Sequence, residues 1–216
     1  SDLTDMLRAD KTRLREYVSR FARELRSLHR IEVHSPVLKD VRRASLQRMP
    51  ELVGVVGTQE EVDTLSKMYE IIPDRFTFLH GDCHPGNVMV KEGKYYFIDM
   101  ANSGFGHPIM DLASMVITYR MPALGNDYED TAKVNPQLKG FSRDEARLIW
   151  DIFIHAYLEI EDPTLIQKAE MQAVAYGCLR MLFLAIQMPG VIPKPRLMDL
   201  KNVALDYCRH LEPICF

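Results

Sequence analysis

The sequence contains few cysteines, and they lie far apart. The four are Cys83, Cys178, Cys208 and Cys215, and no two of them form a C-x-x-C pair. This spacing argues against a disulfide framework and against a structural zinc site. Unpaired thiols of this kind fit a reducing compartment, and we therefore expect a cytoplasmic protein.

Long apolar runs and a strong net charge are also absent. The apolar stretches are interrupted by charges or prolines well before the ~18 residues that a membrane span requires. The chain has 27 Lys and Arg against 30 Asp and Glu, a net charge of -3. No basic field for nucleic acid is evident, so neither nucleic acid nor membrane is expected as a partner. A length of 216 residues fits one large domain.

One segment does carry a chemical pattern. Residues 80–87 read His-Gly-Asp-Cys-His-Pro-Gly-Asn, and Asp99 follows twelve residues after Asn87. The His, the Asp and the Asn have the spacing of the kinase catalytic loop H-R-D-x-x-x-x-N, which a metal-binding Asp follows. Phosphoryl transfer needs a carboxylate to accept the hydroxyl proton, and hard oxygen ligands for Mg²⁺.

The local pattern around Asn87 and Asp99 predicts a β-hairpin. The apolar segments 88–90 and 95–98 flank the turn signal Glu92-Gly93-Lys94. Asn87 then precedes the first strand and Asp99 follows the second. A hairpin brings these two ends together, as one shared Mg²⁺ would require.

Three segments in order resemble a known family. The motif at 80–87, the Ile98-Asp99 pair and the segment 106–113, Gly-His-Pro-Ile-Met-Asp-Leu-Ala, closely resemble the aminoglycoside phosphotransferase and choline kinase-like family. The signature spans roughly residues 76–113. The family usually has Asp where this chain has His107.

The resemblance implies a role for each site residue. Asp82 would be the base that accepts the acceptor's proton, and His80 would support the loop rather than act as base. Asn87 and Asp99 would bind Mg²⁺ and, through it, the nucleotide. Asp111 would brace the catalytic loop, with His84 as a further loop residue.

The implied reaction is transfer of the γ-phosphoryl group of ATP (or GTP) to a hydroxyl of a small molecule. Proteins of this family act on aminoglycosides, choline, ethanolamine, homoserine and sugars, and the sequence does not choose among them. Acidic residues in 126–130 could attract a cationic acceptor, but a solvated loop is the preferred explanation of them.

The implied fold is α+β and mainly helical, namely the C-terminal lobe of a protein kinase-like fold with a small β-hairpin. Residues 1–216 form this lobe as a single unit. Before Gly81 the only glycines are Gly54 and Gly57, so no G-x-G-x-x-G loop is present, and no strand with a V-A-I-K-like lysine is visible. We therefore expect a fragment, or a solitary or reduced lobe, that is inactive alone and able to self-associate through its uncovered lobe face.

Two other functions remain open at this stage. A lobe without its nucleotide-gripping partner could be a substrate-binding or pseudokinase-like module. Alternatively, His80, Asp82, His84, Asp99 and His107 could form the transition-metal cluster of a hydrolase. The hydrolase hypothesis leaves residues 85–87 and the 106–113 segment without a role.

Periodicity and capping signals place the remaining elements. His29 reads as the end residue of a helix, and residues 35–50 as a basic, solvated helix, with a phosphate or partner patch as the alternative. The expected elements are a strand at 76–79, a loop or lid at 122–140, and helices over about 14–29, 58–72, 111–121, 142–158, 163–187 and 195–210.

Overall fold

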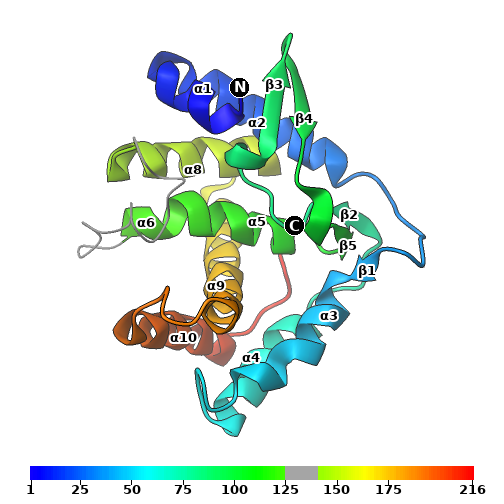
Figure 1. Cartoon of the computed structure of the whole chain (residues 1–216), viewed down its shortest axis with the longest axis vertical. Coiled ribbons are helices and arrows are strands. Elements are labelled where there is room, and N and C mark those ends of the chain that lie inside the picture. Colours follow the sequence, from blue (N-terminus) through cyan, green and yellow to red (C-terminus); the bar gives the residue numbers. More distant parts are fainter. Residues whose placement is uncertain (125–140) are drawn as a thin grey trace.

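The computed structural model describes residues 1–124 and 141–216. The fold is mainly helical with two small sheets (Figure 1). Most of the expected 122–140 loop, including the acidic residues of 126–130, lies outside the described residues.

The described helices are α1 (Leu3–Ala9), α2 (Leu14–Leu28), α3 (Val41–Arg48), α4 (Gln59–Glu70), α5 (Ile109–Met115), α6 (Met121–Leu124), α8 (Arg143–Leu158), α9 (Pro163–Gln187) and α10 (Lys194–Arg209). The strands are β1 (Lys39–Asp40), β2 (Thr77–Leu79), β3 (Val88–Lys91), β4 (Lys94–Phe97) and β5 (Gly104–Gly106).

Local signals explain where the helices begin. Thr58 and Ser142 each form a full capping box, with Glu61 and Glu145 respectively, at the start of α4 and α8. The side chain of Asp162 caps α9, which has Pro163 at its first position. These three starts agree with the sequence prediction.

The core forms where α2, α8 and α9 pack together. Trp150, Phe153, Phe21 and Tyr176 are among the largest side chains that are fully or almost fully buried, and the Phe21 and Phe153 rings lie 5.6 Å apart. The long helix α9 passes through the middle of the molecule, with α5 and α8 near one half and α10 and α4 near the other (Figure 1). Buried residues from α1 to α10 belong to one hydrophobic cluster, so the lobe has one continuous core.

The two sheets position the motif residues. Strands β1, β5 and β2 form a three-stranded sheet, and β3 and β4 form the predicted hairpin. In the hairpin Val88 pairs with Phe97, and the N–H of Ile98 donates to the carbonyl of Asn87 at 3.0 Å. The hairpin thus brings Asn87, before β3, next to Ile98, the residue before Asp99. This is the arrangement that the turn predicted.

The helix predicted over 111–121 is interrupted. Between α5 and α6 the residues Val116–Arg120 form a π-helical turn. Such turns occur frequently at functional sites because they change the direction of side chains along a helix. Ile117 and Thr118, in this turn, line the large cavity described below.

The basic segment 35–50 is not a plain solvated helix. It contains β1 and α3, and several of its side chains are half-buried. Arg42 donates to the carbonyl of Ile72 at 2.6 Å and also contacts Asp74 at 2.5 Å. Its chain segment forms one wall of the same cavity.

Among the described residues, one helix is long and apolar enough to cross a membrane by length and composition, namely Pro163–Gln187. Charged residues interrupt this helix at Lys168, Glu170 and Arg180, as expected from the sequence. In the most apolar 18-residue stretch of this helix, 61% is buried inside the protein. The helix therefore has the character of a core helix and is weak evidence for a membrane span.

Candidate active site

The predicted catalytic loop directly follows β2 and ends in a short 3₁₀ turn, Pro85–Asn87, before β3. Asp82 is half-exposed, whereas its neighbours His80, Gly81 and Cys83 are buried. The loop thus presents one carboxylate to solvent and fixes the backbone on either side of it.

Asp111 is the buried anchor of this loop. Its carboxylate accepts the backbone N–H of His80 at 2.8 Å and that of Gly81 at 2.7 Å. Burial alone would raise the pKa of Asp111, but the hydrogen bonds from His29, His80 and Gly81 hold it below its ordinary value. The geometry is that of the bracing residue implied by the resemblance.

His29 completes this network, a role that the sequence did not reveal. It follows α2 as its C-terminal cap residue, as predicted. Its Nε2 also lies 3.0 Å from Asp111, and its Nδ1 lies 2.7 Å from the hydroxyl of Tyr157. Both bonds form when Nε2 carries the proton and the Tyr157 hydroxyl donates to Nδ1. No local sequence pattern predicts contacts between His29 and residues as distant in the chain as Asp111 and Tyr157.

Gly81 is required by the backbone of the loop. Its φ is +83°, in the left-handed region that favours glycine, and a Cβ there would lie 2.1 Å from the carbonyl oxygen of Asn102. The loop therefore packs against the segment after Asp99 with no space for a side chain.

His80 joins the loop to the end of the hairpin. Its Nε2 donates to the carbonyl of Ile98 at 2.9 Å, and its Nδ1 accepts the N–H of Asp82 at 3.3 Å. Both ring nitrogens thus contact the backbone beside the predicted base and beside Asp99. This is a supporting arrangement, and it leaves His80 no lone pair for a metal.

Asn87 and Asp99 lie at the open end of the hairpin, where the N–H of Ile98, next to Asp99, donates to the carbonyl of Asn87. The Asn87 amide nitrogen donates to the Asp82 carbonyl at 2.9 Å, which turns its oxygen to the other side. Asp99 is exposed, has left-handed φ and ψ of 58° and 56°, and its carboxylate has no hydrogen-bond or ion-pair partner among the described residues. An amide oxygen and an unpartnered carboxylate fit the ligand preference of Mg²⁺.

Backbone strain at Asp99 supports a special role for this residue. Non-glycine residues in the left-handed region cost roughly 1–2 kcal/mol, and such strain gathers at functional sites. Glu92, with φ of 52°, shares this conformation at the hairpin turn, where the turn itself explains it.

His84 and Cys83 have structural positions in the loop. The Nδ1 of His84 accepts the N–H of Gly86 at 3.1 Å, and its Nε2 lies 3.9 Å from an Asp82 carboxylate oxygen. Burial lowers the pKa of His84. Burial, and then the charges of Asp111 and Asp82, raise the pKa of Cys83 well above its usual value, so this thiol is not activated.

His107 stands where the family usually has Asp, and both of its ring nitrogens contact backbone groups. Its Nδ1 accepts the N–H of Ile109 at 3.2 Å at the start of α5, and its Nε2 donates to the carbonyl of Phe216 at 3.2 Å. Burial, reinforced by the charge of Arg75, lowers the pKa of His107 to about 4. A neutral imidazole thus accepts a backbone N–H at the start of α5.

The hydrolase alternative loses its basis. Within the described residues no group of three or more His, Cys, Asp or Glu side chains is placed to hold a metal. The ring nitrogens of His80 and His107 are engaged by backbone groups instead.

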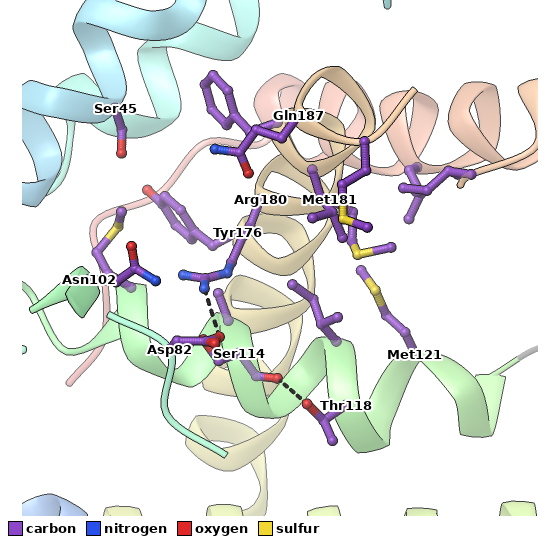
Figure 2. A pocket seen from close by; sticks show the side chains of 18 of the residues that line it. Ser45, Asp82, Asn102, Ser114, Thr118, Met121, Tyr176, Arg180, Met181 and Gln187 are labelled. Carbon is purple, nitrogen blue, oxygen red and sulfur yellow. Dashed lines mark hydrogen bonds and ion pairs between the residues drawn. The ribbon is translucent and has the colours of Figure 1, made fainter. Parts of the chain in front are cut away.

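A further residue, Arg180 on α9, contacts the predicted base. Its Nη2 donates to Oδ1 of Asp82 at 3.0 Å and to the carbonyl of Gly81 at 2.9 Å (Figure 2). Arg180 was not predicted from the sequence, because it stands 98 positions from Asp82 inside an otherwise apolar helix. An arginine interrupting a buried apolar helix was the available signal.

A large cavity opens beside Asp82. It has a volume of about 1010 Å³ and is bounded by the catalytic loop, α3, the α5–α6 segment, α9 and the start of α10. Asp82 and His84 line it, whereas Asn87 and Asp99 do not. Asp82 therefore stands between the hairpin that carries Asn87 and Asp99 and a separate cavity of small-molecule size.

Comparison with solved structures gives a match over nearly the whole chain. A choline/ethanolamine kinase family protein from Mesorhizobium loti has a TM-score of 0.52 at 13% sequence identity. The match covers 99% of this chain and 66% of that protein, so this chain spans just under two thirds of its length. At this identity the match shows a shared kinase-like fold. No curated protein matches the sequence.

The sequence profile described as the phosphotransferase enzyme family matches residues 2–149. That range covers more than half of the 216 residues and includes the whole motif region. The resemblance inferred from the three motif segments is thereby confirmed, and this chain belongs to the phosphotransferase enzyme family.

Proposed function

We propose that the protein containing this chain transfers the γ-phosphoryl group of ATP (or GTP) to a hydroxyl group of a small molecule. The observation that carries the proposal is the position of Asp82. The residue lines a cavity of about 1010 Å³. On the hairpin side, the Asn87 amide donates to its backbone carbonyl at 2.9 Å and lies 3.5 Å from Oδ2 of its carboxylate. A base between an acceptor cavity and metal-type oxygen ligands is the arrangement that phosphoryl transfer requires.

The proposed step is a direct displacement. The acceptor oxygen forms a bond to the γ-phosphorus as the bond from that phosphorus to the bridging oxygen of the β-phosphate breaks. The hydroxyl proton passes to Asp82, and the nucleoside diphosphate leaves with the electron pair of the broken bond. Asp82 is oriented for this by Arg180 and by the Asp111-anchored backbone of Gly81.

Asn87 and Asp99 are the residues that would hold Mg²⁺, which when bound would neutralise charge on the nucleotide phosphates. The contribution of the chain is to hold the two oxygen ligands at adjacent ends of β3 and β4. His80 fixes that junction through its bond to the Ile98 carbonyl.

The nucleotide site is proposed to be incomplete in this chain. We see no Gly-rich loop or strand lysine in its sequence, and the chain covers 66% of the related kinase-family protein. We expect the 216-residue chain to bind Mg-ATP weakly and to show no measurable turnover. Calorimetric titration tests this, and micromolar binding, at about -8 kcal/mol, would contradict it.

The second candidate is a substrate-binding module without catalysis. It is supported by the absence of a Gly-rich loop and a strand lysine from these 216 residues, but the intact set of Asp82, Asn87 and Asp99 favours chemistry. The cytoplasmic location, the lack of nucleic-acid and membrane partners, and self-association through the uncovered lobe face remain predictions from the sequence.

The proposal is tested with protein made from the whole reading frame that encodes this chain. A panel of small hydroxyl compounds is supplied with Mg-ATP, and formation of ADP is measured for each. Acceptor-dependent ADP formation supports phosphoryl transfer. A panel that gives none, while the same protein binds panel members, would favour the binding module.

A further inference from the structure

The cavity beside Asp82 has an apolar side formed by flexible side chains. Met121 and Met181 lie on one side of Arg180 in Figure 2, and Ile117 and Leu184 line the same cavity. Methionine adapts its shape to an apolar ligand and offers no charge or strong hydrogen bond. This side of the cavity therefore suits a hydrocarbon part of a ligand.

The charged groups in the cavity are mainly cationic. Among the described lining residues, the cations are Lys39, Arg48, Arg180 and Arg196, and the acids are Asp82 and Asp199. Arg48 is paired with Glu51, which reduces its effect, and His84 is kept neutral by the lowering of its pKa on burial. The excess of positive charge disfavours an acceptor with several amino groups.

Arg180 has an unused edge next to the base. Its Nη2 is occupied by Asp82 and Gly81, but neither Nε nor Nη1 has a hydrogen-bond partner among the described residues. The guanidinium fork matches a carboxylate with two parallel hydrogen bonds. The edge of Arg180 could thus bind an anion while Nη2 still holds Asp82.

Ser114 adds an unpaired polar atom to the same cavity. The residue lines the cavity beside Asp82 (Figure 2), is 3% exposed, and its Oγ has no hydrogen-bond partner. The oxygen exposes less than 1 Å² of surface, so a polar ligand group reaches it only when the side chain rotates.

We propose that the acceptor is an amphipathic hydroxy acid. Its hydroxyl lies at Asp82, its carboxylate on the unused edge of Arg180, and its apolar chain along the wall that contains Met121 and Met181. Because Arg180 contacts Asp82 at 3.0 Å, the hydroxyl and the carboxylate of the acceptor lie within a few bonds of each other. This inference names the acceptor class of the proposed function and rests on it.

The test is calorimetric titration of this chain with three probes. They are β-hydroxyoctanoate, its methyl ester and neamine, which carries hydroxyls and several amino groups. The acid is expected to bind about tenfold or more tightly than the ester, because a charge-assisted pair with arginine is lost in the ester. Neamine is expected to bind more weakly than either.

Two variants separate the two halves of the site. Arg180→Gln should weaken binding of the acid about tenfold and leave the ester within twofold. Met181→Gln should weaken the acid and the ester to the same extent. Arg209→Gln, a matched exposed change on α10, should alter neither.

The outcomes are decisive in both directions. Failure of the acid to bind, tighter binding of neamine, or equal loss of acid and ester in Arg180→Gln would overturn the inference. Phosphorylation assays on the protein of the whole reading frame distinguish it from the proposed function. An acid that binds but is never phosphorylated contradicts the function alone, whereas phosphorylation of neamine in preference to the acid contradicts the acceptor class alone.

Discussion

The Oδ1 atom of Asp111 accepts the backbone N–H of Gly81 at 2.7 Å and thereby ties helix α5 to the loop that carries Asp82. The same carboxylate accepts a bond from His29, so α2, α5 and the loop meet at one buried charge. The position of Asp82 thus depends on how helices that are distant in sequence pack together.

Asp111→Asn should destabilise the protein by about 3 kcal/mol, because an amide group would place a donor against at least one of three donors around a fully buried site. Denaturant unfolding measures this. Asp151→Asn, a change at a half-exposed carboxylate on α8, serves as control and should leave the midpoint in place. Equal unfolding midpoints for the two variants would show that the hydrogen bonds of the Asp111 carboxylate contribute nothing to stability.

Gly81→Ala should be much more damaging than Gly93→Ala. Both glycines have positive φ, +83° and +72°, so both substitutions carry the left-handed penalty of roughly 1–2 kcal/mol. Only at Gly81 does the new Cβ meet an atom within 4 Å, the carbonyl oxygen of Asn102. The difference between their unfolding free energies reports the clash, and a difference near zero would mean that the loop moves without cost.

His107 should make the protein less stable in mild acid. Its folded pKa is about 4, below the unfolded value of ~6.5, so the unfolded chain binds the proton first as the pH falls. The stabilisation is complete above pH ~6.5 and is lost between there and pH 4, on the order of 2 to 3 kcal/mol.

Replacing His107 should remove part of that pH dependence. In His107→Asn the loss of stability between pH 7 and pH 4 should be smaller than in the unchanged protein, and His84, whose pKa is also lowered, accounts for some of the remainder. His34→Asn, at an exposed histidine, is the control and should follow the unchanged protein. Parallel pH curves for all three proteins would refute the assignment.

Asp99→Gly should separate stability from activity. Glycine relieves the strain at φ 58°, so stability should stay level or rise by up to about 1 kcal/mol. Because Asp99 is a proposed ligand of Mg²⁺, the change should abolish magnesium-dependent turnover in the protein of the whole reading frame. Glu92→Gly relieves similar strain at φ 52° in the turn and should retain activity. Full activity of Asp99→Gly would remove Asp99 from the site.

The sequence was sufficient for features that depend on near neighbours. The capping boxes at Thr58 and Ser142, the start of α9 at Asp162, and the turn at Glu92 and Gly93 are each determined within a few residues. The motif spacing was sufficient for the family. Each of these signals lies within a short stretch of the chain, so it can be recognised in the sequence alone.

The parts that were missed depend on contacts between distant segments. The partner of Asp82 is Arg180, and the partner of Asp111 is His29, each set by how helices pack. The π-helical turn at 116–120 and the role of segment 35–50 as a cavity wall likewise follow from tertiary packing. A single sequence holds no periodic signal for such arrangements.

The central claim is that Asp82 is the base of a phosphoryl transfer reaction, and its most direct test is steady-state kinetics of Asp82→Asn in the protein of the whole reading frame. We predict that kcat falls about a hundredfold or more, while the KM for ATP stays within a few fold, because nucleotide affinity arises from other contacts. Comparable kcat in the variant and the unchanged protein would contradict the account.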